Sequence, residues 1–186
     1  MATDNVYFPL ITTTQLKSLI SEINNNISDD YIENVIMIEQ KKQIRALLGY
    51  SLYNQIQLGV SGSTLSTADQ TLYDDYIKLI LAYSVYKRLV VSMSYQLENA
   101  GLRKKYSDVS ELAEQTEISY VRSMIQDDLD FYKNEMIKYI CNNQSLYPLY
   151  YNDTDARNAN TDNKRSRGYD TGWNISSING GRNIFR

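Results

Sequence analysis

The segment LYDDYIKLILAYSVYKRLVVSMSYQL, residues 72–97, decides the predicted fold. Its apolar side chains recur at alternating intervals of four and three residues, which places them on one stripe of an α-helix for about seven turns. Ser66, followed three residues later by Asp69, is typical of a helix N-terminus just before this segment. The sequence therefore predicts a long amphipathic helix whose stripe is the seam of the core: Leu72, Tyr76, Leu79, Tyr83, Tyr86, Val90, Met93 and Leu97.

A second long helix is predicted from about Ser110 to the residues before Tyr147 and Pro148, because a proline disfavours helix in the residue ahead of it. Between the two helices, the stretch at 99–108 offers Gly101 as a C-cap. Its basic cluster, RKKYSD at 103–108, is interpreted as helix-end charge, with a nucleic-acid site as the alternative. The second helix presents one apolar face: Ile118, Val121, Ile125, Leu129, Tyr132, Met136 and Tyr139.

Shorter helices are predicted before these two, after an extended lead-in at residues 6–11. Thr13 or Thr14 caps the first, which stops in the asparagines at 24–26. Ser28 opens a second helix that ends at Gly49. A short helix at 51–58 then leads into a Gly/Ser-rich loop at 59–64.

These elements predict an all-α fold, a helical bundle built on two long antiparallel helices with shorter N-terminal helices and an extended C-terminal arm. We expect two parts, a helical body at 1–151 and an arm at 152–186. Their charges differ, since the body carries 13 Lys+Arg against 18 Asp+Glu and the arm 6 against 4. Most of the 17 tyrosines are expected at the core boundary; the alternative is that some form protein–protein surfaces.

The residue types argue against an enzyme. The chain has no histidine and one cysteine, so disulfide frameworks, zinc fingers and Ser-His-Asp or Cys-His catalysis are excluded within one chain. Cys141 is expected to be a small buried residue. Adjacent carboxylates such as Asp127 and Asp128 point about 100° apart on a helix and do not converge on a substrate. We expect no catalytic residue, cofactor or metal, and no signal peptide or membrane span.

The arm is the candidate interaction element. It has too little apolar surface to organise itself, so disorder and docking on another surface are the two alternatives. The candidate anchors are Tyr169, Trp173, Ile175, Ile178, Ile184 and Phe185, and the candidate charges are Lys164, Arg165, Arg167, Arg182 and Arg186. The cations could pair with acids on a neighbouring acidic body, or bind nucleic acid weakly and without sequence preference.

Several stretches of the body carry a resemblance to a known family. The run IEQKKQIRALLGYSLYNQIQ at 38–57, a Gly/Ser/Thr loop, NAGLRKKYSD, and YICNNQSLYPLYYN at 139–152 follow one another along the chain. Over about residues 8–152 the chain resembles the head-to-tail connector (adaptor or ring) proteins of tailed bacteriophages. It is most similar to those of phages of Bacteroidetes, including crAss-like phages.

This resemblance implies a structural virion protein of the neck region, assembled in the cytoplasm of a bacterial host. The subunits would form a homo-oligomeric ring of about twelve copies if it follows the portal. Its partners would be the portal protein and other connector or tail proteins, and viral DNA would pass through the channel without specific binding. In this hypothesis the arm lies on a neighbouring subunit or ring. The alternative function is a nucleic-acid-binding accessory protein that uses the basic arm.

Overall fold

The computed structural model describes residues 8–98, 101–104 and 115–152. The elements in chain order are α1 (Thr13–Leu19), α2 (Asp29–Glu39), the π-helical turn η1 (Gln40–Ile44), α3 (Arg45–Leu48), α4 (Tyr50–Gly62), α5 (Thr67–Leu72), the π-helical turn η2 (Tyr73–Ile77), α6 (Lys78–Ser94), β1 (Tyr95–Glu98), β2 (Gly101–Lys104), α7 (Gln115–Asn142), the 3-10 helix η3 (Gln144–Leu146) and α8 (Pro148–Asn152).

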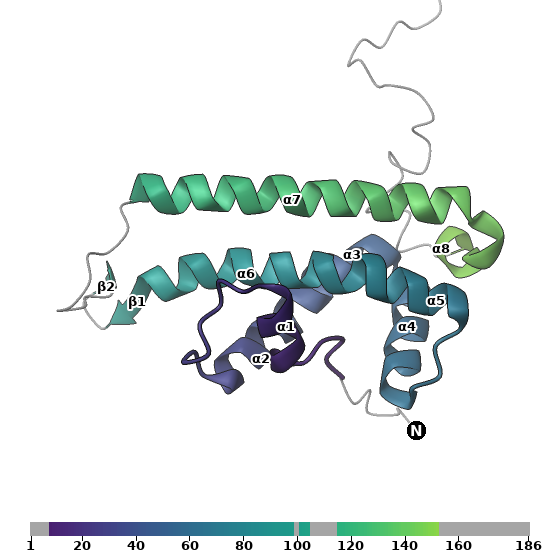
Figure 1. The fold of residues 1–186 in the computed structure, drawn as a ribbon, viewed down its shortest axis with the longest axis horizontal. Coiled ribbons are helices and arrows are strands. Elements are labelled where there is room, and N and C mark those ends of the chain that lie inside the picture. Colours follow the sequence, from purple (N-terminus) through teal and green to yellow (C-terminus); the bar gives the residue numbers. More distant parts are fainter. Residues whose placement is uncertain (1–7, 99–100, 105–114, 153–186) are drawn as a thin grey trace, which may run out of the picture.

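The fold is an all-α bundle built on two long antiparallel helices, as predicted. The α5, η2 and α6 elements form one continuous helical run, and α7 returns alongside it (Figure 1). Ser66 caps this run as expected, because its hydroxyl oxygen accepts a hydrogen bond from the Asp69 N–H and its O–H donates to the Asp69 carboxylate. The predicted arm begins at Asn152, which closes α8; the rest of it, residues 153–186, lies outside the described residues.

The long central helix is covered on two sides. The predicted stripe faces α7, where Tyr76 stacks on Tyr139 with ring centroids 5.1 Å apart and Tyr83 stacks on Tyr132 at 5.5 Å. Apart from Leu72, the described members of this stripe are only partly buried, so the prediction that it forms the core seam was wrong in part. The buried stripe is displaced by about one residue: Tyr73, Ile77, Ile80, Leu81, Ser84, Val85 and Leu89.

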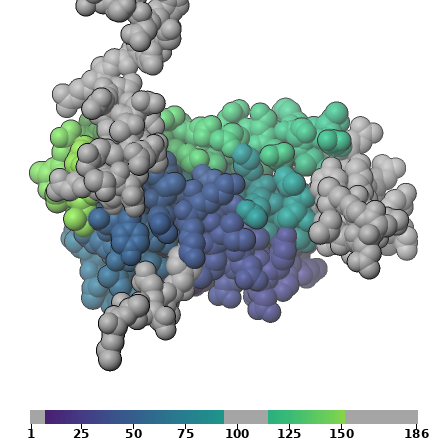
Figure 2. Space-filling model, turned by 180° about the vertical axis from the view of Figure 1, so that it is seen from behind, coloured from purple at the N-terminus to yellow at the C-terminus, as the bar shows by residue number. Residues whose placement is uncertain are grey.

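The N-terminal helices cover that buried stripe. Helices α1 and α2 and the η1 turn all contact α6. In the space-filling view from behind, α2 and η1 fill the middle of the face while α7 runs along its upper edge (Figure 2). The α5, η2 and α6 run therefore lies between α7 on one side and the N-terminal helices on the other. Because it is covered from both sides, the one apolar stripe read from the sequence did not identify its buried residues.

The far end of α6 differs from the prediction. The helix was expected to continue to Leu97, but it ends at Ser94 and the chain forms an antiparallel hairpin of β1 and β2 in the register Tyr95 with Lys104 and Glu98 with Gly101. The basic stretch that was interpreted as helix-end charge therefore begins in a strand. Helix α7 is described from Gln115, and the predicted start near Ser110 lies outside the described residues.

Three smaller predictions were also inaccurate. Thr12, not Thr13 or Thr14, caps α1, through a reciprocal pair of hydrogen bonds with Gln15. The loop expected at 59–64 is helical as far as Gly62. Gly59 lies close to the chain that follows, since a Cβ there would be 2.5 Å from Leu65 Cδ2. Cys141, which was expected to be buried, is only half-buried.

Gly49 does end the second predicted helix. Its backbone has φ 79° and ψ 169°, a conformation that side chains strongly disfavour, and α4 starts at the next residue. Pro148 begins α8, where its missing N–H costs nothing. None of the described helices combines the length and apolar character that crossing a bilayer requires.

The η1 turn positions two different surfaces. Gln40 is fully buried, and its amide binds the lead-in chain: its Oε1 accepts the Leu10 N–H at 2.7 Å, and its Nε2 donates to the Phe8 carbonyl at 2.9 Å and to the Tyr53 hydroxyl at 2.7 Å. The neighbouring Lys42 and Gln43 instead face α6 and α7. The turn thus fixes the N-terminal segment on one side and presents polar side chains on the other.

Candidate functional site: a basic recess and the opposite face of α7

The site residues predicted from the sequence, the arm anchors and arm charges between Lys164 and Arg186, all lie outside the described residues. The described body nevertheless has two surfaces that call for an explanation. One is a recess rich in cations, and the other is an exposed apolar and acidic face of α7. Sequence reasoning identified neither of them.

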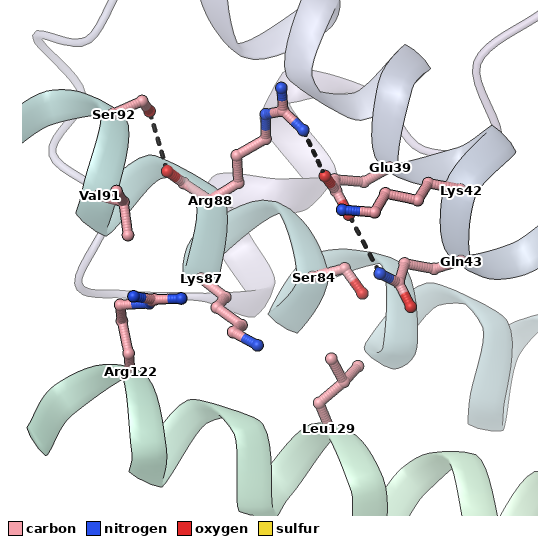
Figure 3. A pocket seen from close by; sticks show the side chains of 10 residues that line it. All are labelled: Glu39, Lys42, Gln43, Ser84, Lys87, Arg88, Val91, Ser92, Arg122 and Leu129. Carbon is pink, nitrogen blue, oxygen red and sulfur yellow. Dashed lines mark hydrogen bonds and ion pairs between the residues drawn. The ribbon is translucent and has the colours of Figure 1, made fainter. Parts of the chain in front are cut away.

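The first surface, the basic recess, is a hollow of about 370 Å³ between α2 and η1, α6, and α7. Figure 3 shows side chains from all three elements converging on it, with Arg122 and Leu129 projecting from α7 toward α6. Ten residues line it: Glu39, Lys42, Gln43, Ser84, Lys87, Arg88, Val91, Ser92, Arg122 and Leu129. Four of these are cations and one is an acid.

A buried carboxylate organises one wall of the basic recess. Glu39 is only 4% exposed, and its Oε1 pairs with Arg88 Nη1 at 2.8 Å while its Oε2 accepts from Gln43 Nε2 at 3.4 Å. Gln43 Oε1 in turn accepts from Lys133 Nζ at 2.9 Å, which ties α7 to η1. A buried carboxylate needs such partners, so this chain of contacts holds the wall in place.

The other cations of the basic recess leave it with a positive balance. Burial lowers the pKa of Lys133, and the nearby Lys87 ammonium lowers it further, against the raising influence of Asp130 and Glu39. Lys87 donates to Gln126, a neutral partner. Lys42 and Arg122 are exposed, and within the described part of the chain neither forms an ion pair. The recess is therefore suited to an anionic group next to the apolar side chains of Val91 and Leu129.

The second surface, the outer face of α7, is apolar where a solvated helix should be polar. Tyr120, Met124 and Phe131 are 67%, 53% and 59% exposed. At 100° per residue they lie within about 40° of one another, directly opposite the buried stripe of Ile118, Ile125, Leu129, Met136 and Ile140. Four carboxylates lie within about 60° of this exposed stripe and belong to the same face: Glu117, Asp127, Asp128 and Glu135.

Charge is segregated around α7. Four of its five acids gather about the outer face, where the one lysine, Lys138, pairs with Glu135 at 2.6 Å. The fifth, Asp130, lies about 100° from the centre of that face, where it accepts from Gln126. Its other two cations, Arg122 and Lys133, project on the opposite side toward the basic recess and the η1 turn. The spacing of Tyr120, Met124 and Phe131, at four and seven residues, was the sequence signal for this face; the inward stripe of the same helix obscured it.

Within the described residues, the acids and Cys141 form no group of three or more that could hold a metal ion. The two surfaces described above offer contacts, charge and apolar area.

A comparison with family models gives one match, to a family of unknown function (DUF6712), over residues 44–160, well over half of the chain. The matched range contains α3 to α8, including the whole outer face of α7 and the α6 and α7 walls of the basic recess. No curated protein and no solved structure matches the chain.

Proposed function

We propose that this chain, which belongs to the DUF6712 family of unknown function, is a structural subunit of a tailed-phage virion. It forms a ring of the head-to-tail connector, lines the DNA exit channel and joins the portal to the tail. The resemblance of residues 8–152 to phage connector proteins supports the identity of the assembly. The surfaces of the body support an assembly role.

The observation that carries the proposal is the outer face of α7. A helix that packs against its own bundle needs one apolar stripe, whereas α7 has a second one on the opposite side, formed by Tyr120, Met124 and Phe131. Exposed apolar clusters of this kind mark protein–protein contacts in soluble proteins. Aromatic and methionine side chains are also those enriched at interfaces. In a ring of identical subunits, such a face would be covered by a neighbour.

Charge supports the same role. The body carries a net negative charge, and a negative wall repels phosphate, so a DNA duplex would slide along it and not adhere. The basic arm would then dock on a neighbouring subunit or the adjacent ring. Trp173, Ile184 and Phe185 would enter apolar pockets there, and Arg165 and Arg167 would pair with acidic side chains. Burying one aromatic side chain contributes on the order of 2 kcal/mol.

Negative-stain microscopy of the purified protein, alone and with its portal protein, tests the proposal. We expect rings, with about twelve copies if they follow the portal. A chain truncated after Tyr151 should stay helical and should fail to join virions. Normal incorporation of the truncated chain would remove the role given to the arm. Salt-sensitive DNA binding by the arm, without rings, would favour the nucleic-acid-binding alternative.

A further inference from the structure

The two surfaces of the body are complementary in charge. The basic recess has Lys42, Lys87, Arg88 and Arg122 around it, with one acid, Glu39, that is already paired. The outer face of α7 has four carboxylates and one lysine, which is itself paired. Complementary charge of this kind selects partners and orients them during association.

The two surfaces also match in shape and polarity. The recess is concave, and its apolar lining residues are Val91, which is partly exposed, and Leu129, which is 2% exposed. The outer face of α7 is a convex helix surface from which Tyr120, Met124 and Phe131 project. A stable interface needs an apolar centre with a polar rim, and this pairing would place aromatic side chains near Val91 and Leu129 and carboxylates among the cations.

A chain cannot fill its own recess with this face. Arg122 projects about 180° around the helix axis from the centre of the outer face, so the recess and the outer face lie on opposite sides of the same rigid helix. The contact therefore needs a second molecule. Two different surfaces on opposite sides give a heterologous contact, which repeats from one copy to the next.

We infer that the outer face of α7 of one copy docks into the basic recess of a second copy, and that this contact joins neighbouring subunits. The inference rests on the proposed ring and names the surfaces that form it. Each subunit uses both surfaces, one toward each neighbour.

Two charge-reversal variants of the full chain test the contact. The first, Asp127→Lys with Asp128→Lys, reverses the outer face; the second, Lys42→Glu with Arg122→Glu, reverses the recess. All four side chains are exposed, so both variants should fold. We expect each to weaken self-association at least tenfold in sedimentation experiments at low salt, alone and with portal protein.

Mixing the two variants gives the decisive result. The intact recess of the first variant meets the intact outer face of the second, and the reversed outer face of the first meets the reversed recess of the second. Rings should therefore return in the mixture, and also in a single chain that carries all four substitutions. Asp30→Lys with Asp75→Lys, two exposed sites outside both surfaces, makes the same charge change as the first variant and should leave assembly unchanged.

The outcomes separate this inference from the proposed function. Rings that persist in both variants would overturn the contact and leave the connector role standing. Loss of rings in the first variant alone would also overturn it, and would indicate that residues 153–186 occupy the outer face instead. Loss in both without recovery on mixing would show that the two surfaces do not meet each other. A wild-type chain that never self-associates, with or without portal protein, would overturn both proposals.

Discussion

Replacing Gln40 by methionine should destabilise the body strongly, because this side chain holds the N-terminal lead-in to the bundle. Methionine has nearly the same length and volume, so packing is preserved while three hydrogen bonds are lost. The Phe8 carbonyl keeps the bond that it accepts from Gln57, whereas the buried Leu10 N–H loses its partner. A lost bond costs about 1 kcal/mol and an orphaned buried donor about 1–3 kcal/mol, which gives a loss of about 3–5 kcal/mol in the free energy of unfolding.

Urea unfolding followed by circular dichroism measures this loss. At a slope of about 2 kcal/mol per molar urea, the midpoint should fall by about 2 M with the slope unchanged. The matched control is Gln144→Met, an exposed glutamine, for which we expect a change within about 0.5 kcal/mol. If Gln40→Met unfolds within about 0.3 M urea of the wild type, the buried amide does not hold the lead-in and the reasoning is refuted.

Three further predictions concern other parts of the body. Gly49→Ala should lower the free energy of unfolding by about 1–3 kcal/mol, because the backbone there has φ 79° and ψ 169°. Its control, Gly62→Ala within α4, should be nearly neutral or stabilising in the same urea titration. Equal effects of the two substitutions would contradict the argument from backbone conformation. Burial, together with the Asp74 charge, raises the pKa of Tyr73 to about 12, whereas an unfolded tyrosine titrates near 10. The protonated Tyr73 hydroxyl therefore contributes about 2–3 kcal/mol to the free energy of unfolding below about pH 10, and this contribution is lost between about pH 10 and 12. The difference in unfolding free energy between the wild type and Tyr73→Phe should shrink over that pH range. A difference that does not change with pH would contradict the raised pKa of Tyr73. Arg88→Met should lower the free energy of unfolding by about 2 kcal/mol, because it leaves the buried Glu39 carboxylate without its cation; the 40% exposure of the Arg88 side chain keeps the loss from being larger. Adding Glu39→Gln should recover most of this stability in thermal melts. If it does not, the two side chains are not coupled.

The predicted elements were most accurate where one strong local signal acted alone. Ser66 with Asp69 fixed a helix start, Gly49 fixed a helix end, and the spacing of Ile118, Ile125, Leu129 and Met136 identified the buried face of α7. Each of these signals depends on residues within one or two turns of one another. Local backbone and side-chain geometry is enough to determine them.

Errors arose where a residue has neighbours on more than one side. The stripe that begins at Leu72 was taken for the core, yet the N-terminal helices bury the adjacent stripe that contains Ile77 and Leu81, and the inserted residue of the η2 turn shifts the helix face. The end of α6 at Ser94 depends on pairing between β1 and β2. The basic recess could not be predicted because its walls come from residues 39–43, 84–92 and 122–129.

The sequence by itself determined that this protein is an all-α bundle with two long helices, and that its body is acidic and its last residues basic. Periodicity and composition are properties of a linear chain, so they can be read without knowing what packs where. Only the tertiary structure decided which stripe of the α5, η2 and α6 run is buried, and that Lys42, Arg88 and Arg122 surround one recess. Those facts depend on contacts between segments far apart in the chain, which local spacing does not encode.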